Sequence, residues 1–567
     1  MGKIRLVHKH GGKMMDEAKT PEGNRASVVA LGILSSRVLG LIRWSLMARY
    51  FGSGAHADVL RAAFQAPNAL QNLLGEGTMS AAFIPVYSKM IEEGRPEAAG
   101  RFAGSILGLL TAVVCAGVLL GVWLAHPICS VLMRGFVGDA AEVAAGLREV
   151  DRLLLAVDMV RLAFPMAGIL VLSSWALGVL NSHRRFLMPY FAPILWNVTI
   201  IGSLLGVGSV IGFTPGENGA SILPETLTRL LTAVFLGGVI GGLMQFLIQL
   251  PSVAFVIKGF RLSLSTRVDG VRRALAAVGP ALAGRGVAQL SAYVDILLAT
   301  LLVEGAVASI GYAQVLYILP ISLFGLSVAA AELPELTRIG ASSFSRMADR
   351  IRAGLRQGLF LAVPTALGYI ALGYVIIGAI YRGGLFGIDD NWLTYFILAT
   401  YSLGLLATVS SRLLQNGFWA LGDTRTPARM ALVRAIIALV VAIPAMFALD
   451  QLSVSQVTGA GSSTLYFGAV GLAAGSAVAA WVEWIFLGWA LKRRLEAAFI
   501  PWRAVAEMIL IVLISLIPTI AFWYVVTQNW SPLWSGITVT VLFAATYLNL
   551  SNLRGRSELK AWLGRLR

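Results

Sequence analysis

Long apolar stretches alternate with short polar segments along almost the whole chain. Between Ser27 and Leu550 the apolar stretches are roughly 20 to 30 residues long, which is what a helix needs to cross about 30 Å of hydrocarbon. We expect each stretch to form one membrane-spanning helix. The fourteen predicted spans are residues 27–50, 58–88, 102–125, 153–181, 189–211, 226–257, 274–302, 306–336, 355–380, 394–421, 428–448, 468–491, 503–526 and 532–550.

The overall composition requires a lipid environment. Of the 567 residues, 57% are hydrophobic and 13% are charged, and the mean hydropathy is +0.77. Soluble domains carry about 25% charged residues, so an aqueous fold could not hide this much apolar surface. We therefore predict an all-α, polytopic membrane protein with about 14 transmembrane helices. The two cysteines, Cys115 and Cys129, are too few for a disulfide framework.

Basic residues are distributed unevenly between alternate connections. If the N-terminus is cytoplasmic, 32 of the 45 Lys and Arg residues fall on the cytoplasmic side, 5 fall on the opposite side and 8 lie within the predicted helices. This asymmetry follows the positive-inside rule and predicts that both termini are cytoplasmic. Because topology accounts for the net charge of +16, we expect no nucleic-acid partner.

The second and eighth predicted spans resemble each other in sequence. Each has a proline near its middle, Pro67 or Pro320, and another before its polar exit, Pro85 or Pro334. Prolines are also common in membrane helices, which is the alternative explanation. A duplication would give two parallel six-helix lobes followed by a terminal helix pair. The predicted divisions are a cytoplasmic tail (1–26), an N-lobe (27–257), a C-lobe (258–491), the terminal helix pair (492–550) and a second cytoplasmic tail (551–567).

Eight arginines lie within the predicted spans, where a central cation costs ~2.5–3.5 kcal/mol on insertion scales. Arg49 and Arg434 are close enough to helix ends for their side chains to reach the membrane interface. Arg161 has Asp158 three residues before it as an ion-pair partner. Arg61 has Asp58 three residues before it, which makes a second candidate pair. The intramembrane acids are few: Asp58, Glu76, Asp295, Glu332 and Glu483.

Arg37 and Arg43 have no such explanation. In a helix that begins near Ser27 they lie about 15 and 24 Å deep, at a rise of about 1.5 Å per residue. Arg285 and Arg412 add cations from the second half of the chain. Cations kept inside a bundle without enough acids need water or an anionic ligand, and the planar fork of arginine suits phosphate. The residues therefore predict a transporter of an anionic, phosphorylated substrate.

Several segments together resemble one known family. They are "SRVLGLIR", "ADVLRAAFQAPNALQNLLGEGTMSAAFIPVYSK", "LGVLNSHRRFLMPYFAPILWN" and "NGFWALGDTRTPAR". These segments look like the MurJ (MviN) family of bacterial lipid II flippases, in the multidrug/oligosaccharidyl-lipid/polysaccharide exporter superfamily. The resemblance implies a V-shaped pair of lobes and a final helix pair that forms a groove for a lipid tail. The implied substrate is an undecaprenyl-pyrophosphoryl disaccharide-pentapeptide, carried between the leaflets of the bacterial cytoplasmic (inner) membrane by alternating access.

The resemblance also implies roles for individual residues. Arg37 and Arg43 would be cations of the central cavity, Asp58 the acid of the second helix and Glu76 the acid of its "GEG" turn. Together with the other arginines, these residues form the predicted substrate-binding set. It consists of Arg37, Arg43, Asp58, Arg61, Glu76, Arg285 and Arg412. No catalytic residue, metal or cofactor is predicted.

The chain departs from the family at several positions. Members usually carry a basic pair where this chain has Gln71 and Asn72, and an arginine where it has Val315, preceded by Gln314. Trp44 stands where an aspartate is often found. These departures leave the exact lipid-linked substrate open, and we expect arginines elsewhere to replace the missing cations. The candidates are Arg61, Arg285 and Arg412.

The chain contains no ATP-binding motif of the form G-x-x-x-x-G-K-[ST]. We therefore expect coupling to the membrane potential or to a cation, for which Asp295 is a candidate ligand. The alternatives are a flippase for another polyprenyl-linked oligosaccharide, a drug exporter of the same superfamily and a membrane-embedded transferase. A transferase is disfavoured because the five histidines are scattered and Asp389 and Asp390 form a lone acidic pair. We expect no enzymatic activity, and the expected partners are the anionic lipid substrate and membrane lipids.

Overall fold

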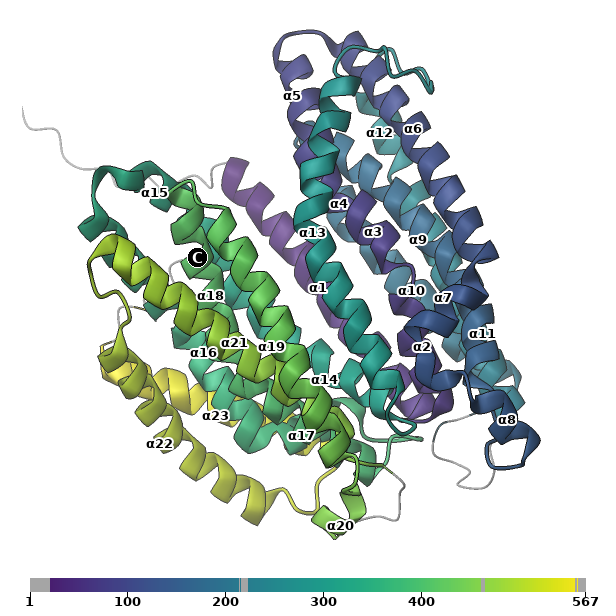
Figure 1. Ribbon diagram of the computed structural model, residues 1–567, viewed down its shortest axis with the longest axis vertical. Helices are drawn as coiled ribbons and strands as arrows, with labels where there is room; N and C mark the ends of the chain where they lie inside the picture. Colours follow the sequence, from purple (N-terminus) through teal and green to yellow (C-terminus); the bar gives the residue numbers. More distant parts are fainter. Residues whose placement is uncertain (1–20, 214, 216–222, 460–464, 556–557, 559–567) are drawn as a thin grey trace, which may run out of the picture.

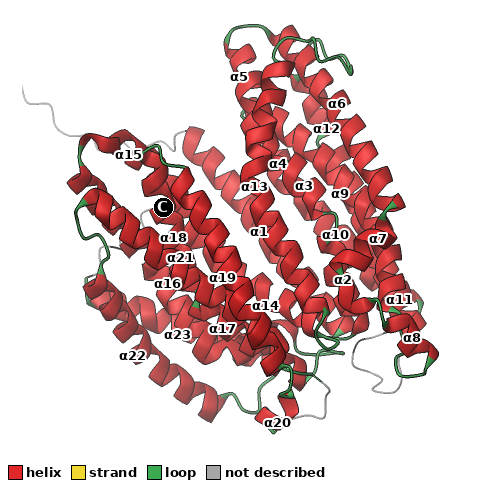
Figure 2. Cartoon of the chain, viewed as in Figure 1, coloured by secondary structure: helices red, strands yellow, loops and turns green. Residues whose placement is uncertain are grey.

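The computed structural model describes residues 21–213, 215, 223–459, 465–555 and 558 (Figure 1). For residues 21–30, 280–288, 324, 327 and 341 it describes the backbone alone. Within these residues the chain is almost wholly helical and contains no β-strand (Figure 2). The predicted all-α fold is therefore confirmed. Most of both predicted tails lies outside the described residues.

Twenty-three α-helices and four short irregular helices follow one another along the described chain. The first half contains α1 (Pro21–Phe51), α2 (Ala55–Gln65), α3 (Asn68–Leu74), α4 (Glu76–Thr78), η1 (Met79–Phe83), α5 (Ile84–Glu92), α6 (Pro96–Trp123), α7 (Ala125–Leu132), η2 (Arg134–Phe136), α8 (Asp139–Ala144), α9 (Arg152–Ser182), α10 (Leu187–Val210), α11 (Pro224–Leu247) and α12 (Leu250–Val256). The second half contains α13 (Val271–Thr300), α14 (Ala306–Pro320), η3 (Ile321–Leu326), α15 (Ser327–Ile339), η4 (Gly340–Ser342), α16 (Phe344–Tyr381), α17 (Ile388–Leu403), α18 (Leu405–Ala420), α19 (Arg425–Leu449), α20 (Val454–Thr458), α21 (Gly468–Leu495), α22 (Trp502–Val526) and α23 (Pro532–Leu553).

Twelve helical segments of the described chain are long and apolar enough to cross a membrane. They match twelve of the predicted spans. The remaining two, the second and the seventh, are present as the series α2 to α5 and as α13. The second span is divided among short helices, so none of them reaches the length of a crossing by itself. About fourteen crossings therefore fit the helices of this multi-pass membrane protein.

The second and eighth spans are both interrupted by a π-helical turn. Pro67 stands between α2 and α3, where its missing N–H group prevents the helix from continuing. The π-helix η1 then follows within the same span. In the eighth span, Pro320 ends α14 and the π-helix η3 follows directly. The two spans that the sequence pairs as a repeat thus share an irregular backbone, while the lobe boundaries themselves stay a prediction.

The helices form a V in Figure 1, with α1 between its two arms. One core cluster joins both halves of the chain at the end where α1 finishes, which we call the closed end. Its large side chains include Tyr50, Leu60, Phe136, Tyr312 and Tyr381. Towards the other end, which we call the open end, each arm has a core of its own. These cores lie around Phe83 and Trp175 in one arm and around Phe360 and Tyr547 in the other.

One helix, α13, departs from a simple division into halves. The helix α13 packs against α3, η1 and α7 of the first half as well as against α14 and α19 of the second. The terminal pair, α22 and α23, packs against α16. Tyr547 of α23 fixes this contact by donating a hydrogen bond from its hydroxyl to the Phe360 carbonyl oxygen over 2.6 Å.

The "NGFWALGDTRTPAR" segment forms the turn between α18 and α19. The carboxylate of Asp423 accepts hydrogen bonds from the backbone N–H of Thr426 (2.9 Å), from its hydroxyl (2.7 Å) and from the backbone N–H of Arg425 (3.0 Å). Arg494 lies 2.6 Å away. The Thr426 hydrogen bonds, aided by the neighbouring arginines, hold the pKa of Asp423 below its usual value. A carboxyl with a lowered pKa stabilises the fold above its unfolded pKa and loses that contribution as the pH falls through the lowered value.

Asp423→Ala is therefore expected to lower the free energy of unfolding by about 1 kcal/mol at neutral pH, as the loss of a helix cap does. Because unfolded aspartate titrates near a pKa of about 3.9, the difference from wild type should shrink below about pH 4. Denaturation of the purified protein in detergent at several pH values measures this difference. Asp349→Ala, at an exposed i,i+3 pair with Arg352, is the control. A difference that does not change with pH would contradict the proposed role of the carboxylate.

Candidate functional site

Asp58 is buried at the closed end, between α2 and the start of α14. Its carboxylate accepts hydrogen bonds from the backbone N–H groups of Gly305 (2.7 Å) and Ala308 (2.8 Å) and so caps α14. Arg152 lies 3.7 Å from it. The interpretation that Asp58 neutralises Arg61 is therefore wrong, because these partners occupy the carboxylate. A ligand could reach it only after the closed end opens, so its place in the substrate-binding set stays a prediction.

The closed end brings the turn between α1 and α2 onto the start of α14. Gly305 has a φ of +92°, and a Cβ atom there would lie 2.3 Å from the Ser53 carbonyl oxygen. Only glycine allows the two segments to approach this closely. The hydroxyl of Tyr312 donates to the Gly52 carbonyl oxygen (2.8 Å), and the hydroxyls of Ser309 and Ser53 lie 3.1 Å apart.

Two ion pairs lie at the closed end, one within the first half and one between the halves. Arg152 pairs with Asp139 over 2.5 Å, next to Asp58. Arg148 pairs with Glu304, whose carboxylate also accepts the backbone N–H of Ala55 over 2.8 Å. These residues could not be found from the sequence because they lie outside the predicted spans. Their partners are also distant in the chain, up to the 249 residues between Ala55 and Glu304.

Arg37 connects the two halves between the closed and open ends. Its Nη1 atom donates a hydrogen bond to the Ser322 hydroxyl on η3 over 2.6 Å. The side chain is half-buried. Among the described residues no carboxylate lies within 4 Å of its guanidinium. A neutral hydroxyl is thus the partner of this intramembrane cation.

Arg43 is a buried cation held by aromatic rings, with 9% of its surface exposed. Its guanidinium carbon lies 4.4 Å from the ring centroid of Trp196 on α10 and 5.5 Å from that of Trp44. Such cation–π contacts attract the charge but do not satisfy its N–H donors. The Nε and Nη1 atoms have no hydrogen-bond partner within the described chain. Unsatisfied buried donors are costly, so an anion that reaches them after the packing around Trp44 and Trp196 opens gains a strong partner.

Arg61 reaches from α2 to the second half. Its Nη2 atom donates to the Gln314 side-chain oxygen on α14 over 2.6 Å. Gln314 precedes the position at which the resemblance implies an arginine, so Arg61 lies next to that place. Its role as a substitute cation for the substrate stays a prediction. The two residues line a cavity of about 50 Å³ together with Gln65 and Asp295. The cavity is large enough for water.

The cations of α18 and α19 lie together in the second half. Arg412 is exposed and lies near Arg434. Glu483 on α21 is 2% exposed, pairs with Arg434 over 2.8 Å and accepts a hydrogen bond from Gln415 over 3.0 Å. Arg434 therefore has a carboxylate partner on another helix, and its position at the membrane interface stays a prediction. Among the described residues Arg412 has no carboxylate within 4 Å.

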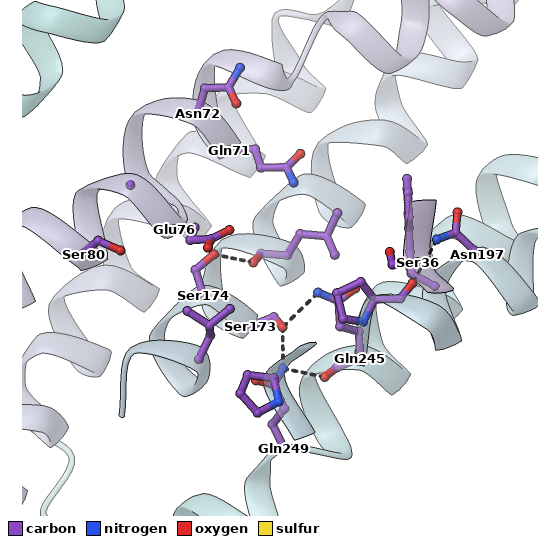
Figure 3. A pocket seen from close by; sticks show the side chains of 16 residues that line it. Ser36, Gln71, Asn72, Glu76, Ser80, Ser173, Ser174, Asn197, Gln245 and Gln249 are labelled. Carbon is purple, nitrogen blue, oxygen red and sulfur yellow. Dashed lines mark hydrogen bonds between the residues drawn. The ribbon is translucent and has the colours of Figure 1, made fainter. Parts of the chain in front are cut away.

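Glu76 lines a pocket of about 670 Å³ within the first half, which we call the Glu76 pocket (Figure 3). Its walls come from α1, α3, α4, η1, α9, α10, α11 and the link between α11 and α12. Serine and amide side chains provide the rest of the polar lining: Ser36, Gln71, Asn72, Ser80, Ser173, Ser174, Asn197, Gln245 and Gln249. No lysine or arginine of the described chain lines it. The structure thus separates Glu76 from the cations of the predicted set.

The structure therefore divides the predicted residues by location. Asp58 lies in the closed end, Arg37 and Arg61 bridge the halves, and Arg43 packs within the first half. Arg285 belongs to α13, but its side chain lies outside the described residues. The expected ion pair between Arg161 and Asp158 is confirmed at 3.1 Å, as are two free cysteines. No cluster of three or more metal-ligating side chains occurs in the described chain.

A sequence profile described as "Lipid II flippase MurJ" matches residues 47–544. The chain belongs to the MurJ family. It is 32% identical over 408 residues to the lipid II flippase MurJ of Burkholderia cenocepacia, covering 70% of this chain and 73% of that protein. It is 26% identical over 494 residues to the probable lipid II flippase MurJ of Buchnera aphidicola, covering 86% of this chain and 88% of that protein. The family predicted from the sequence is thus confirmed.

Solved structures establish the same fold. The chain superposes on the lipid II flippase MurJ in its inward closed conformation with a TM-score of 0.70 and 21% identity, over 93% of this chain and 98% of that one. It superposes on an inward-facing multidrug resistance MATE family transporter of the MOP superfamily with a TM-score of 0.57 and 16% identity, over 83% and 98%. At these identities the likeness establishes a shared transporter fold.

Proposed function

We propose that this chain is a lipid II flippase. It moves an undecaprenyl-pyrophosphate-linked disaccharide-pentapeptide from the inner to the outer leaflet of the bacterial cytoplasmic membrane and catalyses no chemical step. Family membership supports the class of protein, and the names of the relatives supply the substrate. The asymmetry of basic residues supports cytoplasmic termini. The single observation that carries the proposal is the buried guanidinium of Arg43, which has unsatisfied donors and no carboxylate partner in the described part of the chain.

The pyrophosphate binds between the arginines. It satisfies the free donors of Arg43 and replaces the Ser322 hydroxyl as the partner of Arg37. Hydrogen bonds between a guanidinium and a phosphate are roughly twice as strong as bonds between neutral groups, so this exchange is favourable. The polyprenyl tail stays in the lipid beside the terminal helix pair.

Translocation requires that the open end and the closed end are never open to water at the same time. The headgroup enters at the open end, where each arm has its own core. Its anion draws together Arg37 in the first half and Arg61 and Arg412, whose side chains face residues of the second half. As the open end closes, the capping of α14 by Asp58 has to break so that the opposite end opens. This rocking of two bundles about a central site is alternating access.

The membrane potential or a cation supplies the energy. An interior-negative potential favours outward movement of an anion by about 2.3 kcal/mol per charge per 100 mV. Asp295 is the candidate ligand for a coupling cation because its carboxylate lines the small cavity beside Arg61.

A second candidate function is a flippase for another polyprenyl-linked oligosaccharide. It is favoured by Gln71 and Asn72, which leave the Glu76 pocket without a cation.

Complementation tests the proposal in cells. A bacterial strain depleted of its own lipid II flippase is expected to grow when it expresses this chain. The same strain with the Arg161→Ala variant should also grow, because Arg161 forms only an exposed pair. Failure of the membrane-inserted wild-type chain to restore growth, with export of a different polyprenyl-linked sugar, would favour the second candidate.

A further inference from the structure

We propose that the Glu76 pocket is the subsite for the saccharide part of the lipid headgroup and that it excludes the pyrophosphate. This inference rests on the proposed function and assigns the parts of the substrate to different places. The arginines bind the phosphates, and the pocket beside them, which has one carboxylate and no cation among its described lining residues, binds sugar hydroxyls and N-acetyl groups.

The lining of the pocket matches a ligand that both donates and accepts hydrogen bonds. Serine hydroxyls and carboxamides make up its polar wall, and each of these groups can donate and accept. Sugar hydroxyls and amides have the same dual character. The volume of about 670 Å³ lies within the range of about 300–1,000 Å³ that is usual for small-molecule sites.

The charge of the pocket argues against a phosphate. Glu76 is the one charged residue among the lining side chains that the structure describes, and it is exposed to the pocket. Its carboxylate has no hydrogen bond or ion pair within the described chain. A carboxylate repels an anion but accepts bonds from neighbouring hydroxyls. Gln71 and Asn72, which stand where the family usually has cations, add no positive charge to offset this repulsion.

Two wall residues increase the excess of acceptors. Asn197 and Gln249 are 4% and 1% exposed, and the side-chain oxygen of each has no hydrogen-bond partner among the described residues. Their amide nitrogens are in use, since Asn197 donates to the Pro193 carbonyl oxygen and Gln249 donates to Ser173 (Figure 3). Buried acceptors without donors are costly, so a small rotation of these amides into the pocket toward a ligand rich in O–H and N–H groups is favoured.

The pocket adjoins the cations through α1 and Trp196. The Trp196 side chain lines the pocket, and the Arg43 guanidinium stacks on its ring at 4.4 Å. Ser36 lines the pocket, while its neighbour Arg37 contacts Ser322 in the second half. A headgroup whose phosphates contact these arginines therefore has its sugars next to the pocket. This order matches a lipid in which pyrophosphate joins the tail to a disaccharide.

The test uses the full-length chain in lipid nanodiscs and three soluble probes. They are N,N′-diacetylchitobiose, which is a neutral disaccharide, inorganic pyrophosphate and an alanine-containing pentapeptide. Titration calorimetry measures each affinity for wild type and for two pocket variants. Glu76→Gln removes the carboxylate, and Ser80→Phe fills the pocket from an exposed wall position. Ser209→Phe, at an exposed site on α10 outside the pocket, is the matched control.

We expect chitobiose to bind to wild type and to Ser209→Phe, and we expect both pocket variants to weaken that binding by roughly tenfold or more, as the loss of a charge-assisted hydrogen bond does. Pyrophosphate affinity should stay unchanged in the pocket variants. The saccharide assignment is overturned if chitobiose fails to bind, if only the pentapeptide binds, or if the pocket variants weaken pyrophosphate equally. Chitobiose binding by a protein that does not translocate lipid II would overturn the proposed function and leave the saccharide pocket standing.

Discussion

Replacing Arg43 with alanine lowers the rate of lipid translocation by roughly 100-fold or more, because two charge-assisted hydrogen bonds to the pyrophosphate are lost at about 1.5–3 kcal/mol each. The variant still inserts and folds, because the guanidinium is held by aromatic contacts and the loss of a buried cation removes unsatisfied donors. Transport of lipid II in proteoliposomes, normalised to the amount of inserted protein, measures the effect.

Two variants sharpen this prediction. Arg43→Lys keeps the charge but lacks the planar fork of donors, so we expect transport between that of wild type and that of Arg43→Ala. Arg161→Ala removes an exposed cation of another helix and should transport like wild type. Full activity of Arg43→Ala would show that the anion binds elsewhere.

Replacing Asp58 with alanine destabilises the closed end of the protein. The change removes the acceptor of two backbone N–H groups at the start of α14 and one carboxylate near Arg152. We expect the free energy of unfolding to fall by about 3 kcal/mol, the size typical of buried groups that lose a partner. Denaturation of the purified protein in detergent measures the loss, with the exposed Asp158→Ala as the control.

A thiol probe distinguishes loss of the contact between Asp58 and α14 from general unfolding. Ser53 is 8% exposed at the closed end, so Ser53→Cys in a chain without native cysteines should react slowly with a water-soluble maleimide. Adding Asp58→Ala should raise the rate at temperatures far below unfolding, because the contact between α14 and the turn after α1 opens. Unchanged labelling in the double variant would show that the closed end does not depend on Asp58.

Local patterns predicted the elements of this fold well. The apolar runs gave the membrane spans because a helix of fixed rise must cross a hydrocarbon layer of fixed thickness. The prolines that relate the second and eighth spans lie close to the irregular backbone of η1 and η3, which the sequence did not predict. The pair of Arg161 with Asp158 followed from helix geometry alone, since residues three apart share a face.

Contacts between distant segments were the part that the sequence could not supply. Asp58 caps a helix that begins 248 residues later, and Arg434 pairs with Glu483 on another helix. Spacing along one helix gives no information about such partners. The sequence therefore suggested Arg61 as the partner of Asp58, and the membrane interface as the place of the Arg434 side chain. The separation of Glu76 from the arginines also depends on how α9, α10 and α11 pack around it.

The most direct test of the central claim is lipid II accessibility in sealed vesicles that contain the purified chain. With labelled lipid II confined at first to one leaflet and an imposed potential, a membrane-impermeant enzyme reports the fraction that has crossed. The account predicts a time-dependent rise in the accessible fraction with the wild-type chain and almost none with Arg43→Ala. If vesicles with correctly folded wild-type protein protect lipid II as well as protein-free vesicles do, this chain does not carry that lipid.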